Sequence, residues 1–174
     1  MKKAERMTVS HTFGAFWRPD SRYLILGSFP SVKSREMNFY YGHPQNRFWK
    51  ILAAVFHDAA PAADSVAEKK AFLVRNRIAL YDVIDSCSII GSSDSSIRDV
   101  VPTDLTPILA GSQIEDRIFV NGGKAYRLYM KYLLPKTGIE PVKLPSSSAA
   151  NAAWRLDALV SAWGEALAVS HASE

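Results

Sequence analysis

Residues that could bind a flat ligand are concentrated at positions 39–49, FYYGHPQNRFW, which hold five aromatic rings, a histidine, an asparagine and an arginine. A ring such as Tyr40 or Tyr41 can stack on a flat ligand, and the Asn46 amide can both donate and accept hydrogen bonds. A nucleobase needs both features, because it has stacking faces and a polar edge. Simple packing is the alternative role for the two tyrosines.

A second polar stretch, LPSSSAAN, occupies positions 144–151. Its serines stand at the start of a predicted helix, where hydroxyls and backbone N–H groups suit phosphates. An N-cap with a turn is the alternative role for these serines. The segment NGGK at positions 121–124 could also hold a phosphate at a helix start. It lacks the length and the Ser or Thr of a Walker A loop, so an NTPase is not expected.

Several kinds of site are absent from the sequence. GSFPS at positions 27–31 has no GxGxxG spacing, GxSxG does not occur, and the four histidines lack metal-ligand spacing. We therefore expect no cofactor and no metal. Cys87 is the only cysteine, which excludes an intrachain disulfide, and we expect it to be buried. No apolar run approaches the roughly 20 residues of a membrane span and no signal peptide is evident, so we expect a soluble cytoplasmic protein.

The elements that must position these residues follow a strand–helix alternation. Near-continuous apolar runs predict buried strands at 23–29, 78–84, 117–122 and 140–144, and helical spacing follows at 46–56, 65–77, 103–110, 124–134 and 150–168. This order predicts an α/β fold with a parallel sheet covered by helices on both faces. Ligands bind such sheets at the carboxyl ends of the strands. Phe48 and Trp49, just inside the first helix, are predicted to be core residues, and Asn46 its N-cap.

Length and charge give further bounds. The chain has 174 residues, 48% of them apolar, which predicts one globular domain over residues 1–174. The net charge of +4 is uneven: residues 1–50 hold nine Lys and Arg against three acids, whereas the other 124 hold 12 against 14. A basic segment that coincides with the aromatic stretch is typical of a protein with an anionic partner, and a solvated basic face is the alternative.

Three motifs, in this order, resemble the uracil-DNA glycosylase superfamily: LILGSFPS (24–31), YYGHPQNRFWKIL (40–52) and LPSSSAAN (144–151). The second is similar to mismatch-specific uracil and thymine-DNA glycosylases, and the third to the thymine-DNA glycosylase form. The hypoxanthine (deoxyinosine) DNA glycosylase branch is the most similar, because its first motif reads GS-x-P and IALYDVI (78–84) and SSDSSIRDV (92–100) match it too. The resemblance covers residues 23–163.

The resemblance implies a three-layer α/β/α sandwich around a four-stranded parallel sheet. It implies a monofunctional, metal-independent enzyme of base excision repair. Such an enzyme flips a deaminated base out of double-stranded DNA and hydrolyses its N-glycosidic bond. A monomer that works beside the nucleoid is expected.

Site residues carry over onto the matching positions. Tyr41 takes the place of the base-stacking aromatic, with Tyr40 beside it, and Asn46 is expected to position the attacking water or contact the base. His43 either contacts the base or holds its loop. The expected pocket walls are Gly27, Ser28, Phe29 and Pro30. The expected DNA contacts are Ser146, Ser147, Ser148, Asn151, Arg47 and Lys33.

Two departures from the superfamily pattern bear on the substrate. Phe29 stands where most members carry an Asp or Asn that positions water, and Leu144 stands where uracil-specific enzymes carry a base-binding His. Both favour a purine such as hypoxanthine. A mismatch uracil glycosylase, a hydrolase of free nucleosides and a catalytically silent damage-binding module remain as alternatives.

Overall fold

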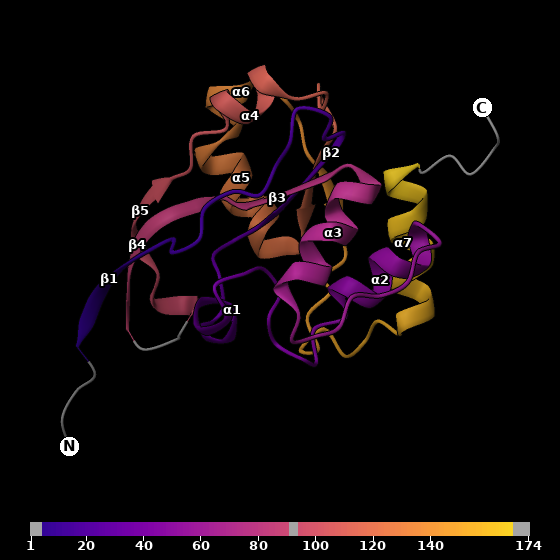
Figure 1. The fold of residues 1–174 in the computed structure, drawn as a ribbon. Helices are drawn as coiled ribbons and strands as arrows, with labels where there is room; N and C mark the ends of the chain where they lie inside the picture. Colours follow the sequence, from indigo (N-terminus) through magenta and orange to yellow (C-terminus); the bar gives the residue numbers. More distant parts are fainter. Residues whose placement is uncertain (1–4, 91–93, 169–174) are drawn as a thin grey trace.

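A four-stranded parallel sheet forms the centre of the computed structural model, which describes residues 5–90 and 94–168 (Figure 1). Its strands are β2 (Tyr23–Gly27), β3 (Ile78–Asp82), β6 (Ile118–Asn121) and β7 (Val142–Leu144), in the order β3-β2-β6-β7. All three neighbouring pairs are parallel. The predicted α/β fold and the four predicted strands are therefore confirmed.

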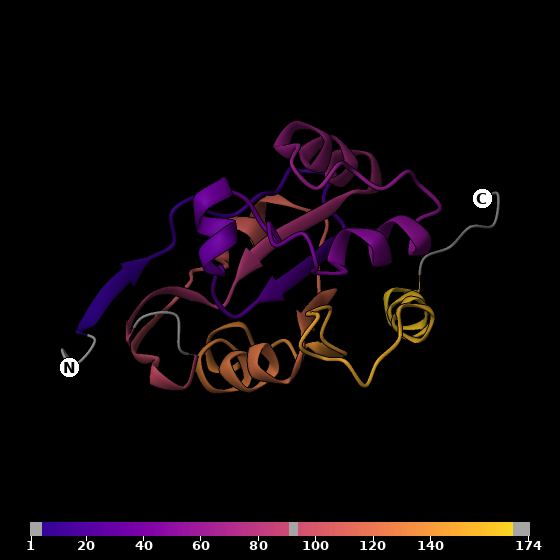
Figure 2. The same cartoon turned by 90° about the horizontal axis from the view of Figure 1, so that it is seen from below.

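Helices cover both faces of this sheet, as the burial of β2 on both sides requires. Figure 2 shows α3 and α5 on opposite sides of the strands. The described helices are α1 (Val32–Met37), α2 (Phe48–Val55), α3 (Val66–Asn76), η1 (Asp94–Ser96), α4 (Thr106–Gly111), α5 (Gly123–Tyr132), α6 (Leu134–Thr137) and α7 (Leu156–Leu167). The five predicted helices are present with shifted bounds, whereas α1, η1 and α6 were not predicted.

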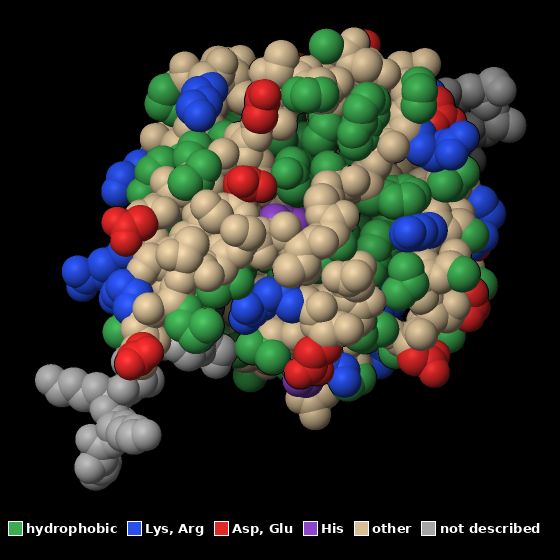
Figure 3. Space-filling model, turned by 60° about the vertical axis from the view of Figure 1, so that its left-hand side comes forward, with side chains coloured by type: hydrophobic (Ala, Val, Ile, Leu, Met, Phe, Trp, Pro, Cys, Tyr) green, Lys and Arg blue, Asp and Glu red, His purple; other side chains and the backbone are tan. Residues whose placement is uncertain are grey.

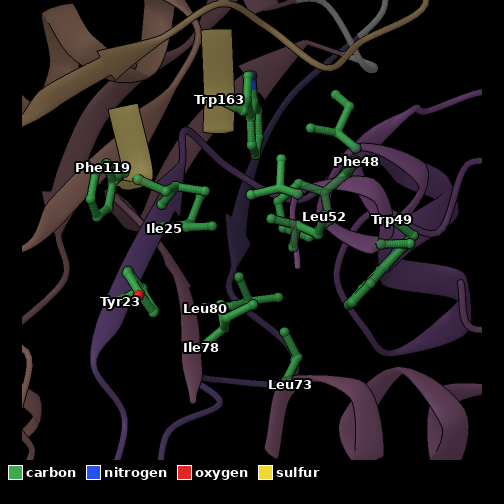
Figure 4. Close-up of a cluster of buried hydrophobic side chains, with 14 of the residues drawn as sticks. Tyr23, Ile25, Phe48, Trp49, Leu52, Leu73, Ile78, Leu80, Phe119 and Trp163 are labelled. Carbon is green, nitrogen blue, oxygen red and sulfur yellow. The ribbon is translucent and has the colours of Figure 1, made fainter. Parts of the chain in front are cut away.

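The core has two halves, one on each face of the sheet. Alternate residues of β2 supply them: Ile25 faces the half built with α2, α3 and α7, and Leu26 faces the half built with α4 and α5. Phe48 and Trp49 are 0% and 6% exposed, which confirms their predicted place in the core (Figure 4). Trp163 of α7 packs edge-on against Phe48.

A second, antiparallel sheet was not predicted. It contains β1 (Arg6–Ser10), β4 (Ile84–Ile90) and β5 (Arg98–Pro102), in the order β1-β4-β5. Figure 1 shows it extending from one side of the molecule. Strand β1 is largely exposed, so it lacks the apolar run by which a strand is recognised. Cys87 of β4 is fully buried, as predicted.

Two kinds of feature are absent from the described part of the chain. No helix there has the length and apolar character that a membrane crossing requires. Nor do three or more His, Cys, Asp or Glu side chains gather there in a way that could hold a metal ion.

Candidate active site

The loops that follow β2, β6 and β7, together with the carboxyl end of β3, surround a cleft with a volume of about 660 Å³. Eleven residues predicted from the sequence line it: Gly27, Ser28, Phe29, Pro30, Tyr40, Tyr41, His43, Asn46, Ser146, Ser147 and Ser148. Residues from three separate stretches of the chain, 27–30, 40–46 and 146–148, are thus brought together at one edge of the sheet. Three other predicted site residues, Lys33, Arg47 and Asn151, do not line the cleft.

The cleft also contains a buried carboxylate that the sequence did not predict. Asp82 is the last residue of β3, pairs in register with Gly27 and is 4% exposed. Its Oδ1 lies 2.6 Å from the position that a Cβ atom on Gly27 would take. Glycine is therefore needed here because the carboxylate occupies the space beside it. A polar residue at the carboxyl end of an otherwise apolar strand was the signal that could have identified Asp82.

Asp82 is paired with His11, which the sequence also left unassigned. The His11 Nε2 lies 2.8 Å from Asp82 Oδ2, and both side chains are almost completely buried. The Gly14 backbone N–H donates to His11 Nδ1, so Nδ1 must be unprotonated and the ring proton must lie on Nε2. His11 is therefore a neutral donor to Asp82. Burial raises the pKa of the Asp82 carboxyl, and the hydrogen bond from His11 opposes that rise.

Asn46 presents a donor to the cleft. Its Oδ1 accepts hydrogen bonds from the Phe48 backbone N–H at 3.0 Å and from the Ser147 hydroxyl at 2.8 Å. A backbone N–H can only donate, so the atom that faces it must be the amide oxygen. Both lone pairs of that oxygen are used, and the Asn46 NH₂ group has no partner among the described residues. Asn46 also supports the start of α2, although the N-cap position itself is Arg47.

Ser147 connects three of the loops around the cleft. It is 1% exposed, and its hydroxyl accepts a hydrogen bond from the Asn121 amide while donating to Asn46. The Ser147 backbone N–H donates to Asn121 Oδ1. Asn121 ends β6, and nothing in its local sequence marked it as a partner of the serine loop. Ser147 is buried and its hydroxyl and backbone N–H are both used, so it joins the loops, whereas Ser146 and Ser148 are partly exposed.

The two tyrosines have different environments. The Tyr40 ring is 2% exposed and its hydroxyl donates to the Gly14 carbonyl, so this ring is part of the cleft wall. Tyr41 is partly exposed and stacks on Phe48 with ring centroids 3.7 Å apart. Burial, and then the nearby Asp82 charge, raise the pKa of the Tyr41 hydroxyl, so it stays protonated. Tyr41 is the better placed of the two to stack on a ligand.

Arg47 holds the loop that carries the serines. Its guanidinium donates to the carbonyls of Ser147, Ser148, Asn151 and Trp154. The sequence suggested a DNA phosphate contact for this side chain. The structure instead uses four of its five N–H groups within the chain, because the turns at 148–154 leave carbonyls without helical partners. The same turns explain why α7 begins at Leu156 rather than near residue 150 as predicted.

Three other predicted residues, His43, Asn151 and Lys33, each contact a residue nearby in the sequence. His43 is exposed and its Nδ1 accepts a hydrogen bond from the Gln45 backbone N–H, which gives it a part in holding its loop. The Asn151 side chain donates to the Ser146 carbonyl. Lys33 is exposed on α1 with Glu36 3.9 Å away. Leu144 is completely buried in the core and does not line the cleft.

A second hollow, with a volume of about 440 Å³, lies next to the cleft and shares Lys124 with it. Arg98, Arg127 and Lys131 also line this hollow, together with Tyr132. We call the four basic residues Arg98, Lys124, Arg127 and Lys131 the basic groove. Figure 3 turns the side of the molecule that carries β4 and β5 toward the viewer, and Lys and Arg side chains stand at several places on that face. The basic groove continues the cleft along a surface suited to an anionic chain.

Comparisons with known proteins agree with this geometry. The family model of the uracil DNA glycosylase superfamily matches residues 15–167. A curated hypoxanthine DNA glycosylase of Methanosarcina acetivorans is 36% identical over 144 residues, covering 82% of this chain and 89% of its own. A protein of the same name from Methanosarcina barkeri is 32% identical over 147 residues, covering 84% and 90%. The solution NMR structure of a candidate uracil DNA glycosylase from M. acetivorans has a TM-score of 0.70 and 32% identity, covering 92% of this chain and 99% of that one.

Proposed function

Because this chain belongs to the uracil DNA glycosylase superfamily, we propose that it is a DNA glycosylase that excises hypoxanthine from deoxyinosine in double-stranded DNA. Two relatives at 36% and 32% identity that bear the name hypoxanthine DNA glycosylase support this substrate. The observation that carries the proposal is the cleft itself. It combines a stacking ring, an amide donor and a buried carboxylate, and it has Phe29 where most of the superfamily carries a polar residue.

The cleft would receive the flipped base with its flat face on Tyr41. That ring is held on its other side by Phe48, so stacking requires little further ordering of the side chain. Flipping costs a few kcal/mol, and less at a mispaired base, which favours damaged positions over normal pairs. The Ser146 and Ser148 hydroxyls would then meet the phosphates beside the flipped nucleotide.

The reaction is a hydrolysis of the bond between the sugar C1′ and the base N9. The bonding electrons leave with the base, a water oxygen adds to C1′, and the two water protons end on the base and on the new hydroxyl. Charge develops on the departing base, so a fixed donor at its edge lowers the barrier. The Asn46 NH₂ group supplies such a donor. Of its two predicted roles, the contact to the base fits better, because both lone pairs of Oδ1 are already used.

We further propose that double-stranded DNA with a deaminated base is the partner, bound by a monomer in the cytoplasm beside the nucleoid. The basic groove would bind the part of the duplex that extends beyond the cleft, by contacting its phosphates. Light scattering with and without a duplex of one lesion would give the stoichiometry, and a 1:1 complex is expected.

Single-turnover cleavage of labelled duplexes tests the proposal. Each duplex carries one inosine, xanthine or uracil opposite each of the four normal bases, and alkali converts abasic sites into strand breaks. Inosine should be cleaved fastest. If no duplex gives an abasic site while binding is retained, the protein is a damage-binding module. Release of base from free deoxyinosine at a comparable rate would identify a nucleoside hydrolase instead.

Uracil is the second candidate substrate. The structural relative described as a candidate uracil DNA glycosylase favours it, at 32% identity and a TM-score of 0.70. The same panel of duplexes separates the two, because a mismatch uracil enzyme should cleave uracil opposite guanine and leave inosine intact.

A further inference from the structure

We infer that Asp82 is a specificity-determining residue that reads the ring N–H created by deamination, and that His11 is the positioning residue that holds its carboxylate for this contact. This inference rests on the proposed function, since it concerns the base that enters the cleft. It assigns a role to His11 and to Asp82, two buried residues that were given none from the sequence, although Asp82 lies within the stretch IALYDVI.

Deamination reverses the hydrogen-bonding character of the base edge. Adenine has an acceptor at N1 and an amino donor at C6, whereas hypoxanthine has an N1–H donor and a carbonyl acceptor. Cytosine and uracil differ in the same way at N3 and C4. An enzyme that holds a flipped base can therefore separate hypoxanthine from adenine, and uracil from cytosine, with one acceptor and one donor along that edge. Adenine or cytosine would leave both groups unpaired in a water-poor site, which is the situation that gives strong discrimination. Guanine and thymine carry the same N–H and carbonyl, so this edge alone does not exclude them.

The cleft holds one group of each kind. Asp82 Oδ2 accepts the His11 N–H, which leaves Oδ1 as the acceptor at the cleft, beside the bare Cα of Gly27. Asn46 supplies the donor, because its oxygen is fixed by Phe48 and Ser147 and its NH₂ group is left for the cleft. Asp82 would thus accept from the base N1–H while Asn46 donates to the adjacent carbonyl oxygen.

His11 fixes the orientation of this carboxylate. The Gly14 N–H holds the imidazole by its Nδ1, so the ring can only donate through Nε2. The ring also packs edge-on against Phe13 and Tyr81, at centroid distances of 4.6 and 5.3 Å, and its side chain is 1% exposed. Asp82 Oδ2 therefore remains an acceptor for His11, and Oδ1 remains directed to the cleft.

A substrate lacking the ring N–H gives the sharpest test. Single-turnover rates are measured for wild-type protein, Asp82→Ala and Asp82→Asn on duplexes with inosine or 1-methylinosine, which keeps the carbonyl but has no N1–H. Wild-type protein should prefer inosine on the order of 10- to 100-fold, the range expected for one hydrogen bond to a charged group. Asp82→Ala should cleave inosine more slowly, and its preference should fall to within about threefold, because it neither rewards the N–H nor excludes the methyl group.

Asp82→Asn is the isosteric companion in case the alanine variant folds poorly. His11 still donates, so the new amide oxygen must face His11 and the NH₂ group must face the cleft. The new NH₂ group would then face the N1–H of the base, which is also a donor. Inosine cleavage should therefore fall at least as far as in Asp82→Ala. Asp85→Ala is the matched control, because Asp85 is an exposed residue of β4 that does not line the cleft. It should behave as wild type on both substrates.

The outcomes separate the inference from the proposed function. Equal loss on inosine and 1-methylinosine in Asp82→Ala, with the preference unchanged, would show that Asp82 acts on the attacking water, and the inference would be wrong. Wild-type rates in Asp82→Asn on inosine would also overturn it. If the wild-type protein leaves inosine intact but cleaves uracil, the proposed substrate fails, and the same comparison with 3-methyluracil tests Asp82.

The pH profile tests the positioning role of His11. The titratable side chains that face Asp82 are His11, Tyr40, Tyr41 and Tyr81. Without the His11 donor, burial is opposed only by the Gly27 backbone N–H, so the pKa of the Asp82 carboxyl rises further. The acidic limb of inosine cleavage in His11→Ala should therefore move to higher pH. His11→Gln restores an N–H donor and should move the limb back toward wild type. An unmoved limb in His11→Ala would show that His11 serves only packing.

Discussion

The carboxylate of Asp82 occupies the space that a side chain on Gly27 would need, with Oδ1 only 2.6 Å from the ideal Cβ position. The two residues are directly opposite each other at the ends of neighbouring parallel strands. The glycine of the motif LILGSFPS is thus explained by Asp82 on the neighbouring strand β3. The backbone of Gly27 needs no positive φ, so the requirement is for space rather than for conformational freedom.

Gly27→Ala should therefore damage the cleft more than the fold. The added methyl group must displace Asp82, whose other oxygen is held by His11, and single-turnover cleavage should fall by about 10-fold or more. Thermal unfolding should show a loss of about 1–3 kcal/mol, which leaves a domain of ordinary stability folded. Gly164→Ala is the control. Gly164 lies in helix α7, and a Cβ atom there would be an ordinary 3.9 Å from Val55 of α2, so this variant should keep full activity. Full activity in Gly27→Ala would show that Asp82 is free to move.

Asn46→Ala should lose most cleavage while binding of a lesion duplex stays within a few fold. Removing one preorganised donor typically costs about 10²- to 10³-fold in rate. Asn46→Asp separates chemistry from capping, because the carboxylate can still accept from Phe48 and Ser147 but has no NH₂ group. Both variants should be slow, and only Asn46→Ala should also lose about 1 kcal/mol of stability with the lost cap bond. Normal cleavage by Asn46→Ala would leave Asn46 with a purely structural role, and normal cleavage by Asn46→Asp alone would favour the water-positioning role over the contact to the base.

Arg47→Lys should weaken the serine loop although it keeps the positive charge. A lysine has a compact ammonium and cannot reproduce four hydrogen bonds to separate carbonyls from one planar group. We expect a lower melting temperature and about 10-fold slower cleavage, with an unchanged dependence of DNA affinity on salt. Arg18→Lys, at an exposed site 4.0 Å from Asp20, should change nothing. A flatter salt dependence in Arg47→Lys would restore the phosphate contact suggested by the sequence.

Charge removal in the basic groove should lower DNA affinity without altering the preference for one base. Arg127→Gln and Lys131→Gln each remove one proposed phosphate contact, so each should reduce the slope of log affinity against log salt by about 1. The measurement is fluorescence anisotropy at several salt concentrations, with matched duplexes that carry inosine or adenine. Arg75→Gln serves as the control, because Arg75 lies on α3, pairs with Asp58 and does not line the basic groove. A wild-type affinity that does not change with salt would exclude this surface.

Much of the main sheet could be predicted from the sequence. Its strands are covered on both faces, so each is an apolar run that differs clearly from the polar loops around it. The antiparallel sheet could not be predicted in this way. Strand β1 is exposed along most of its length, and its register with β4 joins Arg6 to Ile90 across more than eighty residues. Nothing in the local sequence of either strand encodes that pairing.

The sequence predicted the cleft residues that lie together in one short stretch. It did not predict the pair of residues that come together only in the folded chain. Asn46, Tyr41 and the serines stand in short, unusual stretches, whereas His11 and Asp82 are separated by 71 positions. Each of the pair looks ordinary by itself, a histidine in a loop and a polar residue at a strand end. Arg47 was assigned to DNA because carbonyls that become available only in the folded loop are invisible in a sequence.

The exposed edge strand β1 makes one end of the cleft dependent on a weak part of the fold. It pairs only with β4 among the described strands and leads directly into His11. Such strands open locally well below the free energy of global unfolding. We therefore expect hydrogen–deuterium exchange in β1 to be faster than in β2. On warming, Asp82 should lose its partner, and activity should decline, at a temperature where the parallel sheet is still intact.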